Sequence, residues 1–233
     1  MKPDYQNHAS HCDLVVIEGA FSLQEAFSVQ SLGSCVRKLF PSVKRFFEKR
    51  PYFGHIGNAT NYVASKHDCT YLAGFLQLFA PGVAAQVIHL ARISGAAAQW
   101  MMINSSFPDP GTLGIRTAEL LSYGYPSKLG VHVDDGSTYT VLVSLSNPED
   151  YQGGEFLVEF ADYKPEKLTA LVFRSRITNH AVKEVTSGKR QTMTAELWES
   201  IDVPTGFSIP RPTQADVEEY MKKFVDVKLQ SKT

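Results

Sequence analysis

Six short runs with β-strand character follow one another after Ile115, and this regular series limits most strongly how the chain can fold. The runs are rich in β-branched and aromatic residues, and turn-forming residues such as Gly153-Gly154 separate them. They cover residues 117–123, 138–145, 154–160, 168–173, 180–185 and 190–198. Closely spaced strands of this kind predict an antiparallel β-sandwich or barrel.

The first half of the chain has mainly helical patterns. Residues 13–18 (DLVVIE) read as one short strand, and Ser22 with Glu25 has the spacing of a capping box that begins a helix. Residues 72–90 carry apolar residues at helical spacing, and Pro81-Gly82 predicts a break into two helices. Further short helices are expected between Pro41 and Pro51 and over residues 214–229.

A single folded domain is expected, because 233 residues with 43% hydrophobic content suit one globular core. The predicted fold class is mainly β with N-terminal helices (α+β). The expected parts are a flexible N-terminus (1–12), one domain (13–200) with helical support (about 20–105) and a β core (about 115–200), and a C-terminal extension (201–233).

The composition of the chain limits which partners it can bind and in which cellular compartment we expect it. The formal net charge of −1 gives no general affinity for nucleic acid or anionic membranes. The three scattered cysteines form no CxxC pattern, which disfavours a disulfide framework and a thiolate zinc site. The chain has no apolar stretch of about 18 residues and no signal-peptide core near Met1. These features predict an intracellular protein, cytoplasmic or nuclear, without nucleic-acid or membrane partners.

His132 and Asp134 form an HxD pair just before one of the predicted strands. On an extended chain, residues two apart point to the same side, so an imidazole and a carboxylate would project together. Two histidines and one carboxylate can hold Fe(II) on one face and leave positions open for other ligands. His180, the only later histidine, is the expected third ligand.

A simpler interpretation of the HxD pair stays open at this point. Such a pair often arises by chance, and a lone histidine is usually a packed or surface residue. Asp135 would face away from Asp134 on a strand, so we expect it to be a turn or surface acid rather than a ligand.

Arg190 lies ten residues after His180 and shares a strand face with Thr192 and Thr194. A guanidinium can bind a carboxylate through two parallel hydrogen bonds, and hydroxyls can add further donors. An arginine that points into a β-sandwich needs an anionic partner, because an unpaired buried charge is costly. The alternative is an arginine exposed on an edge strand.

Taken together, these segments resemble the Fe(II)/2-oxoglutarate-dependent dioxygenases, in particular the prolyl 4-hydroxylase-like branch. The resemblance covers about residues 115–200 and extends beyond HxD, the later histidine and the arginine. It includes ELLSYGYPSKLGVHVDD, YTVLVSLSNPEDYQGGEFLVEF and LTALVFRSRITNHAVKEVTSGKRQTMTAELW, which occur in the order typical of the family.

The resemblance implies a double-stranded β-helix (jelly roll) with the N-terminal helices packed on one sheet. It also implies that Fe(II) is held by His132, Asp134 and His180. Arg190 would bind the distal carboxylate of 2-oxoglutarate, and Tyr123 and Thr192 would be candidates for hydrogen bonds to this cosubstrate.

The activity implied by the resemblance is C–H hydroxylation, coupled to decarboxylation of 2-oxoglutarate to succinate and CO2 with O2 as the second cosubstrate. A prolyl or other residue in a peptide or protein is the expected substrate, and a free small molecule is the alternative. A non-catalytic jelly roll that binds metal and 2-oxoglutarate is a rival from another class. A cupin-like isomerase or metal hydrolase would leave Arg190 unexplained.

Overall fold

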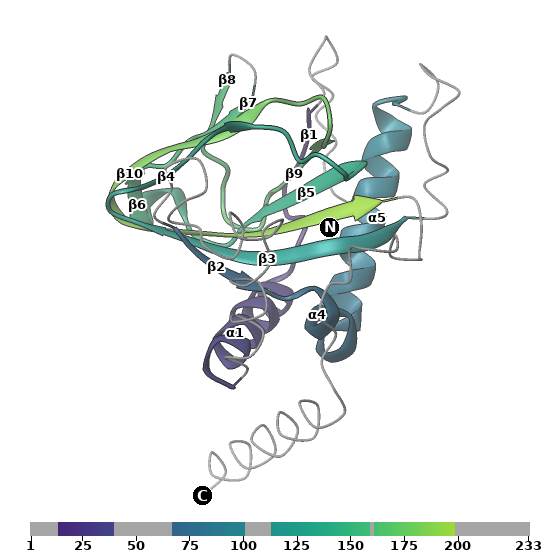
Figure 1. Cartoon of the computed structure of the whole chain (residues 1–233), viewed down its shortest axis with the longest axis horizontal. Coiled ribbons are helices and arrows are strands. Elements are labelled where there is room, and N and C mark those ends of the chain that lie inside the picture. The colour runs from purple at the N-terminus through teal and green to yellow at the C-terminus, as the bar shows by residue number, and fades with distance from the viewer. Residues whose placement is uncertain (1–13, 40–66, 101–112, 159–160, 199–233) are drawn as a thin grey trace, which may run out of the picture.

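The computed structural model describes residues 14–39, 67–100, 113–158 and 161–198. Figure 1 shows the elements in order along the chain. They are β1 (Leu14–Ile17), α1 (Leu23–Leu39), β2 (Asp68–Tyr71), α4 (Ala73–Phe79), α5 (Pro81–Ala97), β3 (Gly114–Gly124), β4 (Ser127–His132), β5 (Tyr139–Ser144), a 3-10 turn (Pro148–Asp150), β6 (Tyr151–Gly153), β7 (Phe156–Val158), β8 (Ala161–Tyr163), β9 (Ala170–Arg174) and β10 (His180–Trp198).

The strands form two antiparallel layers that share β10. The larger layer has the order β1-β9-β5-β10-β3-β2, while β4, β6 and β7 pair with the first half of β10, and β8 pairs with β7. Residues 180–188 of β10 belong to the smaller layer, and residues 189–198 belong to the larger one. This antiparallel double layer with helices on one side confirms the predicted fold class.

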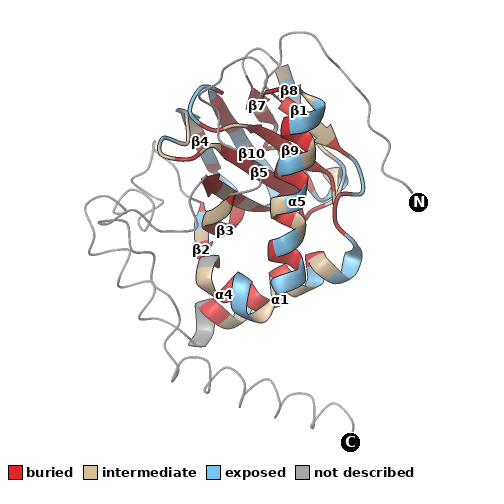
Figure 2. Ribbon diagram, turned by 90° about the vertical axis from the view of Figure 1, so that its right-hand side faces the viewer, coloured by how far each residue is buried: buried red, intermediate tan, exposed pale blue. Residues whose placement is uncertain are grey.

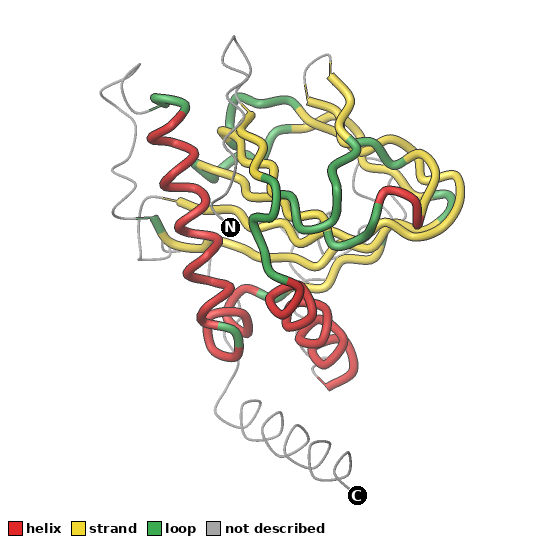
Figure 3. Tube along the Cα trace, turned by 180° about the vertical axis from the view of Figure 1, so that it is seen from behind, coloured by secondary structure: helices red, strands yellow, loops and turns green. Residues whose placement is uncertain are grey.

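Helices α1, α4 and α5 cover the outer face of the larger layer (Figures 2 and 3). Strand alternation explains this cover, because Tyr139, Val141 and Val143 of β5 all point toward the helices. Helix α1 approaches the sheet at Gly33, where an added Cβ would lie 2.4 Å from Cδ2 of Leu120 in β3, so the Leu120 side chain would have to shift.

The inner faces of the two layers enclose a second apolar cluster. Leu142 of β5, Phe173 of β9 and Phe156 of β7 belong to this cluster and are almost fully buried. Polar residues take the other inward positions of β5, including Thr140 and Ser144. The interior between the layers is therefore partly polar, and such buried polar groups need partners.

Several predicted elements agree with the structure. Ser22 and Glu25 form the expected capping box, with Glu25 N–H donating to Ser22 Oγ at 3.2 Å. The break at Pro81 separates α4 from α5 as predicted. The helices predicted between Pro41 and Pro51 and over residues 214–229 lie outside the described residues.

Two expectations about the strands are wrong. Residues 180–185 and 190–198 form one bent strand, because Gly188 takes a positive φ of 74° and lets the chain turn without leaving the ladder. The first half also contributes β2, which pairs with β3 at the edge of the larger layer. The division of the chain into a helical and a β half is therefore not strict.

A fragment that begins near Ile115 should be insoluble or molten, because it lacks the helices that cover the outer apolar face and both edge strands, β1 and β2. Thermal unfolding followed by near-UV circular dichroism tests this expectation. A cooperative transition in the fragment would contradict it and would show that the β core folds alone.

Candidate active site

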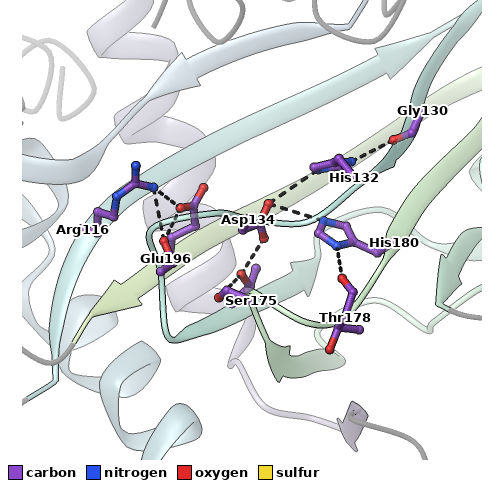
Figure 4. Close-up of polar contacts among 10 residues, drawn as sticks. Arg116, Gly130, His132, Asp134, Ser175, Thr178, His180 and Glu196 are labelled. Atoms are coloured by element: carbon purple, nitrogen blue, oxygen red, sulfur yellow. Dashed lines mark hydrogen bonds and ion pairs between the residues drawn. The ribbon is translucent and has the colours of Figure 1, made fainter. Parts of the chain in front are cut away.

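Three of the predicted site residues meet between the two layers. His132 ends β4, His180 begins β10, and the two are direct cross-strand partners with ring centroids 4.1 Å apart. Each Nε2 atom lies 3.5 Å from Oδ1 of Asp134 (Figure 4). One ligand atom from each residue lies within 4.8 Å of the others, which is close enough to bind one metal ion.

Outer contacts fix the orientation of all three side chains. Nδ1 of His132 lies 2.8 Å from the Gly130 carbonyl oxygen, and Nδ1 of His180 lies 3.1 Å from that of Thr178. An N–H at each Nδ1 donates to these carbonyls, which leaves each Nε2 lone pair facing the centre. The Thr140 hydroxyl donates to Asp134 Oδ2 at 2.6 Å, which leaves Oδ1 facing the same centre as the two Nε2 atoms.

Burial sets the protonation of the histidine pair. It lowers the pKa of His180 to about 4, and burial together with the neighbouring His180 lowers the pKa of His132. Both rings are therefore neutral near pH 7, which is the form that binds metal. Burial also raises the pKa of Asp134, so that its anionic form needs a nearby cation.

Asp134 reaches the centre in a different way from the one expected. The strand ends at His132, so strand alternation does not orient Asp134. Its N–H donates instead to the Ser175 carbonyl at 3.0 Å, and Ser175 Oγ lies 2.8 Å from the Thr140 hydroxyl that holds the carboxylate. A nearby hydroxyl, that of Thr140, and a residue distant in sequence, Ser175, therefore place this side chain.

Asp135 follows in an exposed turn. Asp135→Asn should therefore change turnover by no more than a few-fold, since an exposed group away from the centre contributes little. Steady-state 2-oxoglutarate turnover of the variant is the measurement. A loss as large as that of Asp134→Asn would mean that Asp135 supplies the carboxylate.

Arg190 lies deep in the larger layer and is only 1% exposed. Its strand runs between β3 and β5, so the alternative of an exposed edge-strand arginine is wrong. Its Cζ lies 5.2 Å from the ring centroid of Tyr123, its cross-strand neighbour. Neither terminal guanidinium nitrogen has a hydrogen-bond partner among the described residues.

The groups around Arg190 are also unsatisfied. The hydroxyls of Tyr123, Tyr151 and Thr192 are buried and have no hydrogen-bond partner within the described part of the chain. Tyr151 is a further candidate that the sequence did not indicate. Gly154 lies so close that an added Cβ would stand 3.1 Å from Arg190 Cδ. Buried donors of this number fit a carboxylate ligand.

A cavity of about 640 Å³, counted with its open mouth, contains the histidine pair and Asp134. Its wall includes four side chains that the sequence did not indicate as site residues: His67, Cys69, Glu119 and Glu196. Glu119 and Glu196 occupy inward positions of β3 and β10, and Arg116 pairs with Glu196. Glu119 and Glu196 lie within two of the predicted strands, and acids at such positions could have indicated a polar surface between the layers.

Glu119 should make stability depend on pH in the metal-free protein. Burial, followed by the charges of Glu196 and Asp134, raises its pKa to about 8. Since the folded state holds this proton more tightly, stability is lost as pH rises from about 4.5 to about 8. Glu119→Gln should therefore stabilise the protein at pH 8.5 by a few kcal/mol and far less at pH 5. Thermal unfolding of chelator-treated wild type and variant at both pH values tests this prediction. An equal difference in melting temperature at the two pH values would contradict it.

The β core matches a known superfamily. Residues 118–198 match the family model described as the 2OG-Fe(II) oxygenase superfamily. No curated protein sequence matches the chain. None of the helices in the described part of the chain has the length and apolar character needed to span a bilayer.

Solved structures share the fold at low sequence identity. A prolyl-4-hydroxylase of Pseudomonas putida has a TM-score of 0.52 and 14% identity, over 80% of this chain and 92% of that one. The non-heme α-ketoglutarate-dependent epimerase SnoN from nogalamycin biosynthesis also has a TM-score of 0.52, with 13% identity over 86% and 88% of the two chains. Both likenesses confirm the jelly-roll architecture.

The superfamily match confirms the resemblance found in the sequence. It also confirms the enzyme class, a 2-oxoglutarate-dependent oxygenase, and the cofactors of that class, which are Fe(II), 2-oxoglutarate and O2. The polar interior described above fits this cofactor set, since it offers two imidazoles and a carboxylate for a metal and a buried guanidinium for an organic anion.

Proposed function

We propose that the β core, whose residues 118–198 match the 2OG-Fe(II) oxygenase superfamily, hydroxylates a C–H bond of a residue in a peptide or protein. The observation that carries the proposal is the convergence of His132, Asp134 and His180 in one cavity, whose wall also includes the buried, unsatisfied hydroxyls of Tyr123 and Thr194. A chance HxD pair would not be expected to lie beside a distant histidine, with Nδ1 of both histidines hydrogen-bonded to backbone carbonyl oxygens.

Fe(II) would be held by Nε2 of His132, Nε2 of His180 and Oδ1 of Asp134. Three protein ligands on one face leave the other positions of the metal for cosubstrates. The bound metal supplies the redox chemistry that couples oxidation of 2-oxoglutarate by O2 to hydroxylation. The protein contributes by keeping both imidazoles neutral and correctly turned and by holding one carboxylate oxygen toward the centre.

Arg190 would bind the distal carboxylate of 2-oxoglutarate, with Thr192 and Tyr123 as further donors. Each of these groups is buried and carries unsatisfied hydrogen-bonding atoms. A planar guanidinium matches a carboxylate through two hydrogen bonds, and the low polarity of the surroundings strengthens this pair. Tyr151 can contribute another hydroxyl from β6.

The choice of a peptide substrate rests on the prolyl 4-hydroxylase-like features of the sequence. The fold alone does not decide, because SnoN, named as an epimerase of nogalamycin biosynthesis, is as similar in structure as the prolyl-4-hydroxylase. A free small molecule is therefore the second candidate substrate.

Succinate release from the full chain with Fe(II), 2-oxoglutarate and O2 tests the proposal. One arm contains pooled proline-bearing and other peptides, and a matched arm contains pooled metabolites. We expect faster succinate release with the peptides and a product 16 Da heavier than its peptide. Stimulation by metabolites alone would assign the second substrate class. Binding of metal and 2-oxoglutarate without succinate in either arm would support a non-catalytic module.

A further inference from the structure

His67 is a buried side chain of the cavity for which the proposed function has no role. It is 7% exposed and directly precedes β2, the edge strand that the first half of the chain contributes. Its imidazole stacks on the ring of Tyr123, with ring centroids 4.8 Å apart and 30° between the planes. A ring pair of this geometry contributes stabilising free energy in addition to that from the burial of apolar area.

Strand pairing explains why the two rings meet. In the β2–β3 register, Asp68 lies opposite Ser122 and Cys69 lies opposite Leu121. Continuing this antiparallel register by one residue brings His67 to Tyr123. Figure 1 shows β2 beside β3 at this edge of the larger layer. The backbone ladder therefore brings a residue from the first half of the chain to the candidate cosubstrate site.

Tyr123 links His67 to Arg190. The Tyr123 ring is fully buried and contacts the guanidinium of Arg190 as well as the imidazole of His67. The Tyr123 hydroxyl has no hydrogen-bond partner among the described residues. Since the hydroxyl is rigidly attached to the ring, whatever fixes the ring also fixes the direction in which the hydroxyl points.

We propose that His67 is a positioning residue for 2-oxoglutarate, which holds the Tyr123 ring so that its hydroxyl and the Arg190 guanidinium address the same carboxylate. This inference rests on the proposed function. It assigns to His67 a packing role through its aromatic face rather than a direct role in the reaction. The first half of the chain would then help to build the cosubstrate site as well as support the sheet.

A titration of 2-oxoglutarate into the Mn(II)-loaded full chain tests the role of His67. His67→Ala should raise the dissociation constant for 2-oxoglutarate about three- to tenfold, which is the effect of losing one aromatic stack. His67→Phe keeps a stacking ring and should stay within about twofold of wild type. His89→Ala, which truncates an exposed histidine of α5, is the matched control and should have no effect.

Two outcomes would overturn the inference alone. Wild-type affinity in His67→Ala would remove any positioning role, and a Phe variant as weak as the Ala variant would assign the effect to an imidazole nitrogen. If wild type itself does not bind 2-oxoglutarate, the proposed function fails instead. Should His67→Ala not fold, His67→Leu takes its place, because it fills the space without a ring.

A double-variant cycle separates positioning from general damage. If His67 acts through the Tyr123 hydroxyl, adding His67→Ala to Tyr123→Phe should weaken 2-oxoglutarate binding by less than about twofold. Fully additive losses would overturn the inference. Mn(II) affinity should be unchanged in every variant, since neither residue is a proposed ligand.

Discussion

His132→Ala combined with Asp134→Ala should reduce the affinity for Fe(II) or Mn(II) by more than about a hundredfold and abolish 2-oxoglutarate turnover. Loss of an outer partner of a metal ligand already costs about 10–100-fold in affinity, and this variant removes two proposed ligands. The remaining His180 offers a single nitrogen, which is too few donors to hold a divalent ion against water. Titration of the purified chain with Mn(II) measures the effect, and wild type should bind about one ion.

Loss of metal in this variant would not reflect unfolding. Burial raises the pKa of Asp134 and lowers that of His132, so both groups lie in a site where the charged form is unfavourable without a metal. Their removal should leave the melting temperature of the chelator-treated protein close to that of wild type, although a cavity is created. His89→Ala provides the control for histidine truncation. A stoichiometric ion bound by the double variant at wild-type affinity would refute the assignment.

The sequence predicted the strand series and the identity of the residues that meet in the interior. His180 is the best example, because the fold brings it opposite His132 across a distance of 48 positions in the chain (180 − 132). The match of several ordered segments made this prediction possible. Local patterns alone left the HxD pair open to a chance interpretation.

The support of the site could not be predicted from local patterns. Thr140 holds the Asp134 carboxylate from six residues away, but the contacts of Ser175 with the Asp134 N–H and the Thr140 hydroxyl form only when β5 and the end of β9 lie side by side. His67 reaches Tyr123 only because β2 joins the sheet, and its short sequence, DCTY, gives little strand signal. Pairing between distant segments depends on the whole fold, which strand propensity does not encode.

At the bend of β10, by contrast, the sequence did contain a local signal. A Ser-Gly pair between two strand-like runs normally indicates a turn, and Gly188 does adopt a positive φ. At Gly188 any Cβ would collide with the backbone of Asp150, so the glycine allows a close crossing between strands while the ladder continues. The residue type was informative, but its role depended on a neighbour distant in sequence.

Arg190→Ala should weaken 2-oxoglutarate binding to the Mn(II)-loaded protein by on the order of a hundred- to a few thousandfold. In the proposed complex the guanidinium neutralises a carboxylate in a buried site, and truncation leaves that carboxylate without its partner. Breaking a buried pair costs roughly 3–5 kcal/mol, which corresponds to this range of affinities. Mn(II) binding should be unchanged, because Arg190 is not a proposed ligand.

Arg190→Lys distinguishes charge from geometry at the same position. The ammonium keeps the charge but lacks the planar fork, so we expect only partial recovery of the affinity lost in Arg190→Ala. Arg92→Ala, at an exposed position of α5, is the matched control and should bind 2-oxoglutarate as wild type does. Without 2-oxoglutarate, Arg190→Ala should not be strongly destabilised, because the guanidinium nitrogens lack hydrogen-bond partners among the described residues. Equal dissociation constants for Arg190→Ala and wild type would refute the assignment of Arg190 to the cosubstrate, and the buried guanidinium would then need another anion.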